Sequence, residues 1–380
     1  MRLLIAPASL KGSLSAAEVA VALAQGAQRA AQALGQQIEI DAVPLADGGE
    51  GTVDAVERAR GGTRRTARVR DPLGRPIDAS YLLLDDGTAV MEMAAASGLP
   101  LLAPAERNPL LASTAGTGDL IAAAVEAGAR RLVIGVGGSA TVDGGAGMAA
   151  ALGVRLLDAT GRQIAPGGGP LAQLERIDLS GLRPDLRGLP IDVLCDVRNP
   201  LTGPMGAARI FGPQKGATPE MVETLDAALG RMGEIVARDL GREIADQPGA
   251  GAAGGLAAGL VAFLGAHLRP GIEVIMDLLG VEQRIAAADL ILTGEGQIDG
   301  QTVGGKVIAG LARAAQPRGV PLVAIAGRVT PEAAALYEHG LSAAFSLADG
   351  PRSLEESQQY GADLLARAAE NVLRLWLARR

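Results

Sequence analysis

The sequence predicts an α/β protein with a doubly wound, largely parallel sheet and a second, inserted α/β domain, and three observations support this fold class. Apolar runs of strand length alternate with segments of helical periodicity, most clearly at the two ends of the chain, as is typical of parallel sheets crossed by helices. The 380 residues are 48% apolar, which is enough for two domains that each bury a core. Glycine supplies 53 residues, about twice its usual share of ~7%, and much of this excess stands beside polar side chains.

The two ends of the chain supply the elements of the first domain. Short apolar runs predict its strands, and apolar residues at i, i+3 and i+4 predict its helices. The predicted strands are 3–6, 38–43, 290–292, 321–326 and 343–345, and the predicted helices are 16–34, 307–315, 331–339 and a terminal helix from about residue 354. We therefore expect residues 1–69 and 288–380 to form one discontinuous domain.

The middle of the chain, residues 70–287, differs in texture and is expected to be the inserted domain. A hairpin of strands 77–84 and 89–93 is predicted, because the Asp-Asp-Gly sequence at 85–87 is typical of a turn. A further strand is expected at 131–136. Glycine-rich segments then recur along this part of the chain.

Charge and composition exclude several classes of partner. The net charge is −7 and no basic block is longer than a few residues, so we expect no nucleic-acid or membrane-surface partner. The only cysteine, Cys195, permits no intrachain disulfide and favours a cytoplasmic location. Residues 249–268 carry no Asp, Glu, Lys or Arg, but their six glycines favour a buried core segment over a membrane span. The oligomeric state stays open, with a homodimer among the alternatives.

Glycine is concentrated in four polar segments. They are Lys11-Gly12-Ser13, residues 47–52 (DGGEGT), residues 137–145 (GGSATVDGG) and residues 293–302 (TGEGQIDGQT). Bare backbone beside a polar group suits a phosphate cradle, because amide groups reach phosphate oxygens without a Cβ in the way. Any one segment is equally consistent with an ordinary turn, in which Asp before Gly is common. Four such segments together favour a phosphate-binding site.

The lysines lie in or beside glycine-rich sequence. The 35 basic residues include only three lysines, Lys11, Lys215 and Lys306, and each has a glycine neighbour. A chain that otherwise uses arginine has kept lysine where a compact, strongly hydrated charge suits an anion. Lys11 follows the first strand and Lys306 begins a helix, so we expect both to bind phosphate or a substrate carboxylate. For Lys215, a solvated turn remains an alternative.

Two glycine motifs indicate other nucleotide-binding folds. Residues 300–307 match a P-loop, except that Val307 replaces the Ser or Thr that would hold Mg²⁺. Residues 135–140 follow a predicted strand and precede Asp158 by the roughly 20 residues of a dinucleotide-binding fingerprint. Against the second interpretation, the Asp-Gly-Gly sequence at 143–145 would lie inside the helix that should follow. Because residues 135–140 still fit this fingerprint, an NAD(P)-dependent oxidoreductase remains an alternative function.

Over essentially the whole chain, the sequence resembles the bacterial two-domain glycerate kinase family. The similarity is carried by IAPASLKGSLSAAEVA (5–20), ADGGEGTVDA (46–55), DPLGRP (71–76), EMAAASGL (92–99), GTGDLI (116–121), GVGGSATVDGGAGM (135–148), CDVRNPLTG (195–203), FGPQKGA (211–217), PGAGAAGG (248–255) and TGEGQIDGQT (293–302). The resemblance implies a flavodoxin-like domain, a smaller α/β domain that closes on the cleft, and ATP-dependent phosphorylation of D-glycerate, usually at the 2-hydroxyl.

At four positions the chain departs from the usual residues of this family. Members usually carry Asp where this chain has Ala8, and Asn where it has Val142. They usually carry Arg or Lys in place of Gln297, and His in place of Gly304. Each position lies inside a matching segment. The exact hydroxy acid therefore stays open, and a catalytically inactive nucleotide- or hydroxy-acid-binding protein is a second alternative.

Phosphoryl transfer needs donors on the phosphates, carboxylates for Mg²⁺ and an acceptor for the hydroxyl proton. We assign these roles to residues of the matching segments. The catalytic candidates are Lys11, Asp47, Asp196, Asp299 and Lys306. The ATP-binding candidates are Ser13, Gly137, Gly138, Ser139, Lys215 and Glu295, and the Mg²⁺ candidates are Asp196 and Glu295. The sequence does not decide which carboxylate accepts the proton.

Overall fold

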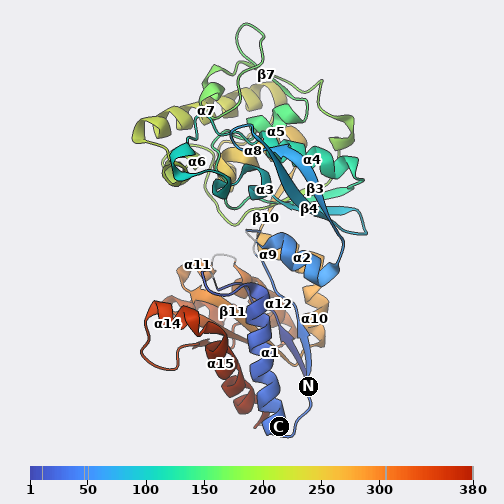
Figure 1. Ribbon diagram of the computed structural model, residues 1–380, viewed down its shortest axis with the longest axis vertical. Coiled ribbons are helices and arrows are strands. Elements are labelled where there is room, and N and C mark those ends of the chain that lie inside the picture. Colours follow the sequence, from blue (N-terminus) through green and yellow to red (C-terminus); the bar gives the residue numbers. More distant parts are fainter. Residues whose placement is uncertain (11, 47, 50, 304–305, 379–380) are drawn as a thin grey trace. The chain divides into compact units, whose positions relative to one another are not determined.

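The computed structural model describes all residues except 11, 47, 50, 304–305 and 379–380, and only the backbone of 301 and 303. The chain forms two compact units, each with its own sheet (Figure 1). Unit 1 comprises Met1–Asp47, Asp54–Arg60 and Pro270–Arg380, and unit 2 comprises Gly48–Val53 and Gly61–Arg269. The division into a discontinuous domain and an inserted domain at residues 69 and 288 stays a prediction.

Unit 1 contains a parallel sheet of five strands in the order β2-β1-β11-β12-β13. The strands are β1 (Arg2–Ile5), β2 (Glu39–Ala42), β11 (Leu290–Ile298), β12 (Leu322–Val329) and β13 (Ala343–Ser346). Counted within the unit, this is the order 2-1-3-4-5 of flavodoxin-like folds, whose switch point lies between the first and third strands. The expected fold class is confirmed, and the switch point lies between β1 and β11.

The helices of unit 1 follow most of the predicted ranges. They are α1 (Ala16–Ala33), α2 (Thr52–Arg60, whose first residues belong to unit 2), α9 (Gly271–Leu279), α10 (Val281–Ala287), α11 (Gly300–Val303), α12 (Val307–Ala315), α13 (Ala335–Glu338), α14 (Leu354–Gln359) and α15 (Gly361–Leu377). Ser15 and Ser353 begin α1 and α14 with capping boxes. The predicted terminal helix is interrupted at Tyr360, and the predicted helix 331–339 is a 3₁₀ turn (Pro331–Ala334) followed by α13.

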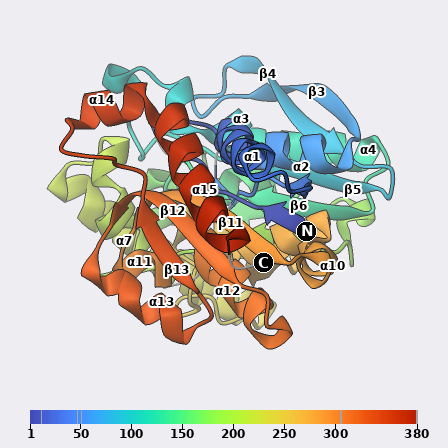
Figure 2. The same cartoon turned by 90° about the horizontal axis from the view of Figure 1, so that it is seen from below.

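Helices α1 and α15 lie side by side on one face of the unit 1 sheet (Figures 1 and 2). Their buried Ala and Leu side chains pack with strand residues such as Leu3 and Leu292. Gly26 of α1 permits this close approach, since a Cβ there would lie 2.0 Å from the carbonyl oxygen of Ala366. The small side chains that the sequence places along α1 therefore set the spacing of the two helices.

We expect Gly26→Ala to destabilise the protein by about 1–3 kcal/mol, because the added methyl group forces α1 and α15 apart. The matched control is Gly230→Ala in α7 (Pro219–Leu240), where the atom nearest the new Cβ is Thr202 Cγ2 at 4.0 Å. The control is expected to keep or raise stability, since alanine favours helix by up to ~1 kcal/mol over glycine. Urea unfolding followed by circular dichroism measures both. Equal stability of the two variants would contradict the close helix contact.

Unit 2 contains a six-stranded mixed sheet in the order β10-β9-β6-β5-β4-β3. The strands are β3 (Thr63–Arg70), β4 (Pro76–Leu83), β5 (Thr88–Glu92), β6 (Arg131–Gly135), β9 (Ile191–Leu194) and β10 (His267–Arg269). Strands β5, β6, β9 and β10 are parallel, and the predicted hairpin is confirmed as the antiparallel pair β4 and β5. Strand β3 was not predicted, because Val69 is the only one of its residues that is buried.

The remaining elements of unit 2 surround this sheet. The helices are α3 (Ala94–Ser97), α4 (Ala115–Glu126), α5 (Ala146–Ala151), α6 (Ala207–Phe211), α7 and α8 (Leu256–Leu264), and strands β7 (Arg155–Leu157) and β8 (Arg176–Asp178) form a separate antiparallel pair. Short 3₁₀ turns include η1 (Leu99–Leu101), η2 (Pro104–Glu106), η3 (Gly169–Gln173), η4 (Pro184–Leu186), η5 (Pro213–Lys215) and η6 (Ala252–Gly255).

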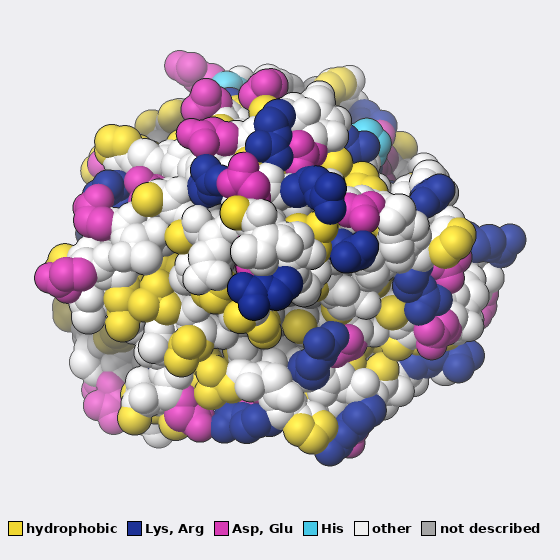
Figure 3. Space-filling view, turned by 90° about the horizontal axis from the view of Figure 1, so that it is seen from above, with side chains coloured by type: hydrophobic (Ala, Val, Ile, Leu, Met, Phe, Trp, Pro, Cys, Tyr) yellow, Lys and Arg dark blue, Asp and Glu magenta, His cyan; other side chains and the backbone are white. Residues whose placement is uncertain are grey.

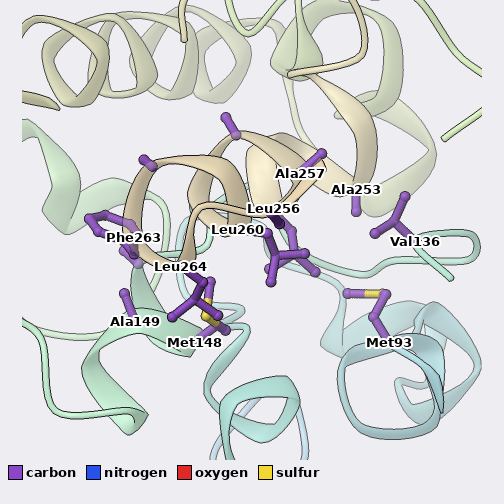
Figure 4. Packing of buried hydrophobic residues seen from close by; sticks show 14 of the residues in the cluster. Met93, Val136, Met148, Ala149, Ala253, Leu256, Ala257, Leu260, Phe263 and Leu264 are labelled. Atoms are coloured by element: carbon purple, nitrogen blue, oxygen red, sulfur yellow. The ribbon is translucent and has the colours of Figure 1, made fainter. Parts of the chain in front are cut away.

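Helix α8 lies in the core of unit 2, where Leu260 and Leu264 pack near Met148 of α5 (Figure 4). The uncharged segment 249–268 is therefore largely a core segment, as predicted. Among the described residues, no helix is both long and apolar enough to cross a membrane.

Charged side chains of both signs are interspersed over the face of the molecule in Figure 3. Ion pairs of this kind in unit 2 include Arg209 with Glu223 at 2.6 Å and Arg183 with Glu126 at 2.6 Å. Exposed pairs contribute little to stability. On this face, basic side chains lie beside carboxylates and are not gathered into one basic patch.

Candidate functional site

The glycine-rich loop 136–145 follows β6 at the carboxyl edge of the parallel strands of unit 2. Ligands of open α/β sheets bind at this edge. The loop is fixed to the segment after β5, because the Leu99 N–H donates to the Gly138 carbonyl oxygen at 2.8 Å and the Ala140 N–H to that of Ser97 at 3.0 Å. Gly138 has a φ of +72°, which favours glycine. Gly137 and Gly138 are exposed, so their backbone is open to a ligand.

A second predicted segment packs against the start of this loop. A Cβ at Gly135 would lie 2.5 Å from the carbonyl oxygen of Gly48, and a Cβ at Gly137 would lie 3.1 Å from the Cα of Gly49. Side chains at these positions would push the segments apart. Two of the four glycine-rich segments are therefore brought together within unit 2.

Lys215 lies at the end of η5, directly beneath the loop. Its side chain is only 2% exposed, and its Nζ donates to Ser139 Oγ at 2.6 Å and to the Thr141 carbonyl oxygen at 2.8 Å. Burial lowers the pKa of the Lys215 ammonium to about 7, and the Asp143 carboxylate opposes this shift. The alternative of a solvated turn lysine is therefore wrong.

Asp143 is fully buried and interacts electrostatically with Lys215. Its Oδ2 accepts hydrogen bonds from the Thr114 N–H at 2.8 Å, the Thr114 hydroxyl at 2.9 Å and the Gly147 N–H at 3.2 Å. Its Oδ1 accepts one from the Gly145 N–H at 3.1 Å. Burial raises the pKa of Asp143, while these hydrogen bonds oppose the shift. Asp143 thus joins the end of the loop to the start of α4.

Asp196 follows β9, the sheet neighbour of β6, so it leaves the sheet at the same edge as the glycine-rich loop. Its side chain is exposed. The preceding Cys195 is half-buried, and its thiol donates to the carbonyl oxygens of Val197 and Gly249. Burial raises the pKa of the Cys195 thiol to about 11, which does not suit a nucleophile. Of Cys195 and Asp196, only Asp196 therefore remains a candidate functional residue.

Two residues that support the loop, Gly254 and Thr114, were not predicted from the sequence. Gly254 has a φ of +68°, and a Cβ there would lie 1.9 Å from the Thr141 carbonyl oxygen. The Gly144 N–H donates to the Gly254 carbonyl oxygen at 3.0 Å. Thr114 is also missing from the predicted set. The available signal was weak, because both residues lie in or beside matching segments but carry no charge.

In unit 1, Glu295 and Lys306 lie together near the switch point. Lys306 is the N-cap residue of α12, and its Nζ is 3.7 Å from Glu295 Oε1 on β11. The Lys306 side chain is 31% exposed and that of Glu295 is 13% exposed. Strand β11 continues to Ile298, so most of the segment 293–302, which we expected as a loop, is strand. The structure therefore confirms neither role, but it brings two predicted residues into contact.

The other described candidates of unit 1 make hydrogen bonds to residues of the same unit. Asp299 lies between β11 and α11, where its Oδ1 accepts from the Thr302 N–H at 3.3 Å and its Oδ2 from Gln297 Nε2 at 3.0 Å. Ser13 Oγ donates to the carbonyl oxygen of Gln358 at 3.1 Å. Lys11, Asp47 and Gly304 lie outside the described residues.

The described candidates thus fall into two groups. Unit 2 contains Gly137, Gly138, Ser139, Asp196 and Lys215, and unit 1 contains Ser13, Glu295, Asp299 and Lys306. The two Mg²⁺ candidates, Asp196 and Glu295, belong to different units. Within the part of the chain that the structure describes, no three His, Cys, Asp or Glu side chains are arranged to hold a metal ion. The metal ligands stay a prediction.

The topology does not favour the dinucleotide-binding interpretation. Strand β7, which precedes Asp158, pairs with β8 in a separate sheet, whereas the acidic residue of a Rossmann fold follows a strand of the main parallel sheet. Asp143 lies in a loop before α5, so no helix begins directly after β6.

Comparison with known proteins shows similarity over the full chain. The sequence model of the glycerate kinase family matches residues 3–377. The chain is 47% identical over 373 residues to a glycerate kinase of Bacillus subtilis (strain 168), and 46% identical over 373 residues to a glycerate 2-kinase of Escherichia coli (strain K12). Each alignment covers 98% of this chain and 97% of the relative. A crystal structure of a candidate glycerate kinase 2 from Salmonella typhimurium LT2 matches with a TM-score of 0.86 at 47% identity, covering 100% of this chain and 98% of that chain.

Proposed function

Because the chain belongs to the glycerate kinase family, we propose that it transfers the γ-phosphate of ATP to the 2-hydroxyl of D-glycerate. The observation that carries this proposal is the glycine-rich loop at the carboxyl edge of unit 2, with exposed backbone at Gly137 and Gly138 and a lysine beneath it. Relatives named glycerate kinase, which match over nearly their full length, support glycerate as the substrate. The single cysteine supports a cytoplasmic location, and a homodimer stays an open alternative.

The loop of unit 2 suits the phosphates of ATP. Backbone N–H groups without neighbouring Cβ atoms bind phosphate oxygens at close range. Lys215 Nζ donates to Ser139 Oγ, so its positive charge lies beside the residue that follows the exposed glycines. We assign the phosphate oxygens to Gly137 and Gly138, with Ser139 and Lys215 supporting them.

The Lys306–Glu295 pair of unit 1 suits a second anionic group. Lys306 stands at the N-terminal end of α12, where the helix dipole also favours negative charge. Its Nζ lies 3.7 Å from the largely buried Glu295 carboxylate, which orients the lysine side chain. We assign Lys306 to a phosphoryl oxygen or the substrate carboxylate, and we extend the same role to Lys11.

Mg²⁺ would supply charge neutralisation of the triphosphate. In such sites Mg²⁺ uses one or two carboxylates together with substrate phosphates, so a single exposed carboxylate such as Asp196 fits this donor set. Glu295 is the corresponding candidate in unit 1. The hydroxyl proton of the substrate would pass to a carboxylate, for which Asp47 and Asp299 are the remaining candidates.

We expect Lys306→Ala to lower kcat/KM by at least ~10-fold, or about 1.4 kcal/mol of transition-state stabilisation. The melting temperature should change little, because the Lys306 side chain is partly exposed and its ion pair with Glu295 is long, at 3.7 Å. The matched control is Arg313→Ala, which removes an exposed cation from the last turn of the same helix. Steady-state kinetics measure both. Wild-type kinetics in Lys306→Ala would remove this residue from the proposed site.

The decisive test of the function is an ATP-consumption screen over D-glycerate, L-glycerate and tartronate, with phosphorus NMR of the product. We expect D-glycerate to give the highest kcat/KM and the product to be 2-phosphoglycerate. A 3-phosphoglycerate product would contradict the assigned hydroxyl. ATP binding without turnover on any hydroxy acid would favour an inactive binding protein.

A further inference from the structure

A charged side chain occupies the interior of unit 2 beside the proposed phosphate loop. Lys215 is only 2% exposed and is among the largest fully buried side chains of the chain. Burial of an ammonium is unfavourable unless hydrogen bonds and an opposite charge compensate it. Lysine is also rare in this sequence. A purely structural core position is more readily filled by an apolar side chain.

The contacts of Lys215 are concentrated on the loop. Its Nζ donates to the side chain of Ser139 and to the backbone carbonyl of Thr141, at 2.6 Å and 2.8 Å. Ser139 directly follows the exposed glycines Gly137 and Gly138, and Thr141 lies two residues further along the chain. One ammonium group therefore fixes both the side chain and the backbone of the segment that leaves the proposed phosphate site.

This buried cluster keeps hydrogen-bonding capacity that its own contacts do not use. An ammonium has three N–H donors, and two of them have acceptors in Ser139 and Thr141. The Thr141 hydroxyl is buried and has no hydrogen-bond partner among the described residues. The Asp143 carboxylate already accepts four hydrogen bonds. The Lys215 ammonium thus keeps a third donor beside the loop, and a positive charge at this position favours the binding of an anion.

We propose that Lys215 is a positioning residue that holds the loop in the conformation that binds ATP phosphates. It acts through Ser139 and Thr141 and does not touch the reacting atoms. This inference rests on the proposed function of the loop.

The charge of Lys215 gives the inference a pH signature. Among the described residues, Asp143 is the ionisable group that acts electrostatically on Lys215, and Ser139 and Thr141 offer it only uncharged oxygens. The Lys215 ammonium loses its proton, and with it its charge, as the pH rises through about 7. Because the charged form attracts phosphate, ATP affinity should fall as the pH rises through this value, and bound ATP should raise the pKa of Lys215.

The first measurement compares Lys215→Met, which keeps a long side chain and removes the charge, with the wild-type protein. We expect the Kd for Mg-ATP to rise at least ~10-fold, while kcat at saturating ATP falls less than ~3-fold. The pH dependence of Kd near 7 should also disappear in Lys215→Met. The matched control is Arg187→Met, which removes an exposed cation from the same unit and should leave Kd unchanged.

The second measurement uses the wild-type protein, so it does not depend on the folding of a variant. Because the chain has three lysines, ¹³Cε-labelled lysine gives three resonances, and the Lys306→Ala and Lys215→Met spectra identify two of them. We expect the Lys215 signal to titrate with a midpoint near pH 7, and we expect Mg-ATP to shift this midpoint to higher pH. A midpoint that nucleotide does not move would overturn the positioning role.

The two proposals fail in different ways. If calorimetry shows no ATP binding to the wild-type protein, or if ATP leaves the amide signals of Gly137 and Gly138 unchanged, the proposed function of the loop is wrong. If ATP binds there and Lys215→Met keeps the wild-type Kd and pH dependence, the positioning role alone is wrong.

Discussion

Excess EDTA is expected to lower ATP-dependent phosphorylation of D-glycerate by at least ~100-fold, or about 2.7 kcal/mol of transition-state stabilisation. Each of the two carboxylates proposed for Mg²⁺, Asp196 in unit 2 and Glu295 in unit 1, would repel a triphosphate unless a cation lies between the carboxylate and the phosphates. Mg²⁺ added beyond the chelator should restore the rate. Phosphorus NMR measures the product directly and avoids coupling enzymes that themselves need Mg²⁺.

The control for this experiment is the fold of the chelated protein. The proposed Mg²⁺ binds together with the nucleotide, so EDTA should leave the circular dichroism spectrum and the melting temperature of the protein unchanged. Loss of activity together with loss of structure would indicate a structural metal instead. Full activity in excess EDTA would contradict the proposed role of the cation.

Replacing Asp143 with alanine is expected to lower the free energy of unfolding by about 3 kcal/mol or more. The change removes the acceptor of four hydrogen bonds and leaves the buried ammonium of Lys215 without its carboxylate. Urea unfolding measures the loss. The matched control, Asp158→Ala, removes another turn aspartate, which is half-buried and accepts from the Thr160 N–H, and its effect should be much smaller.

A double-mutant cycle tests whether charge pairing is the cause. Adding Lys215→Met to Asp143→Ala removes the uncompensated cation, so the double variant should be more stable than the sum of the two single losses predicts. Strict additivity would show that the two side chains act independently. The cycle would then attribute the effect of Asp143→Ala to its hydrogen bonds with Thr114, Gly145 and Gly147.

Much of the fold could be predicted because its strands carry their own signal. The apolar runs at 3–6 and 131–136 match β1 and β6, which are buried on both faces. Strand β3 could not be predicted, since its residues are mostly polar and exposed and it is defined by pairing with β4. The length of β11 was missed for a similar reason, because its glycine-rich end becomes a strand by pairing with β12.

The sequence by itself determined the fold class, the family and the segments from which the candidate site is built, because these depend on local patterns of apolar residues, glycine and charge. Tertiary structure alone decided what Lys215 contacts. It also decided that Asp143 hydrogen-bonds to Thr114, and that Glu295 and Lys306 meet near the switch point. These contacts join residues far apart in the chain, and burial, which sets the pKa of Lys215, depends on everything packed around it.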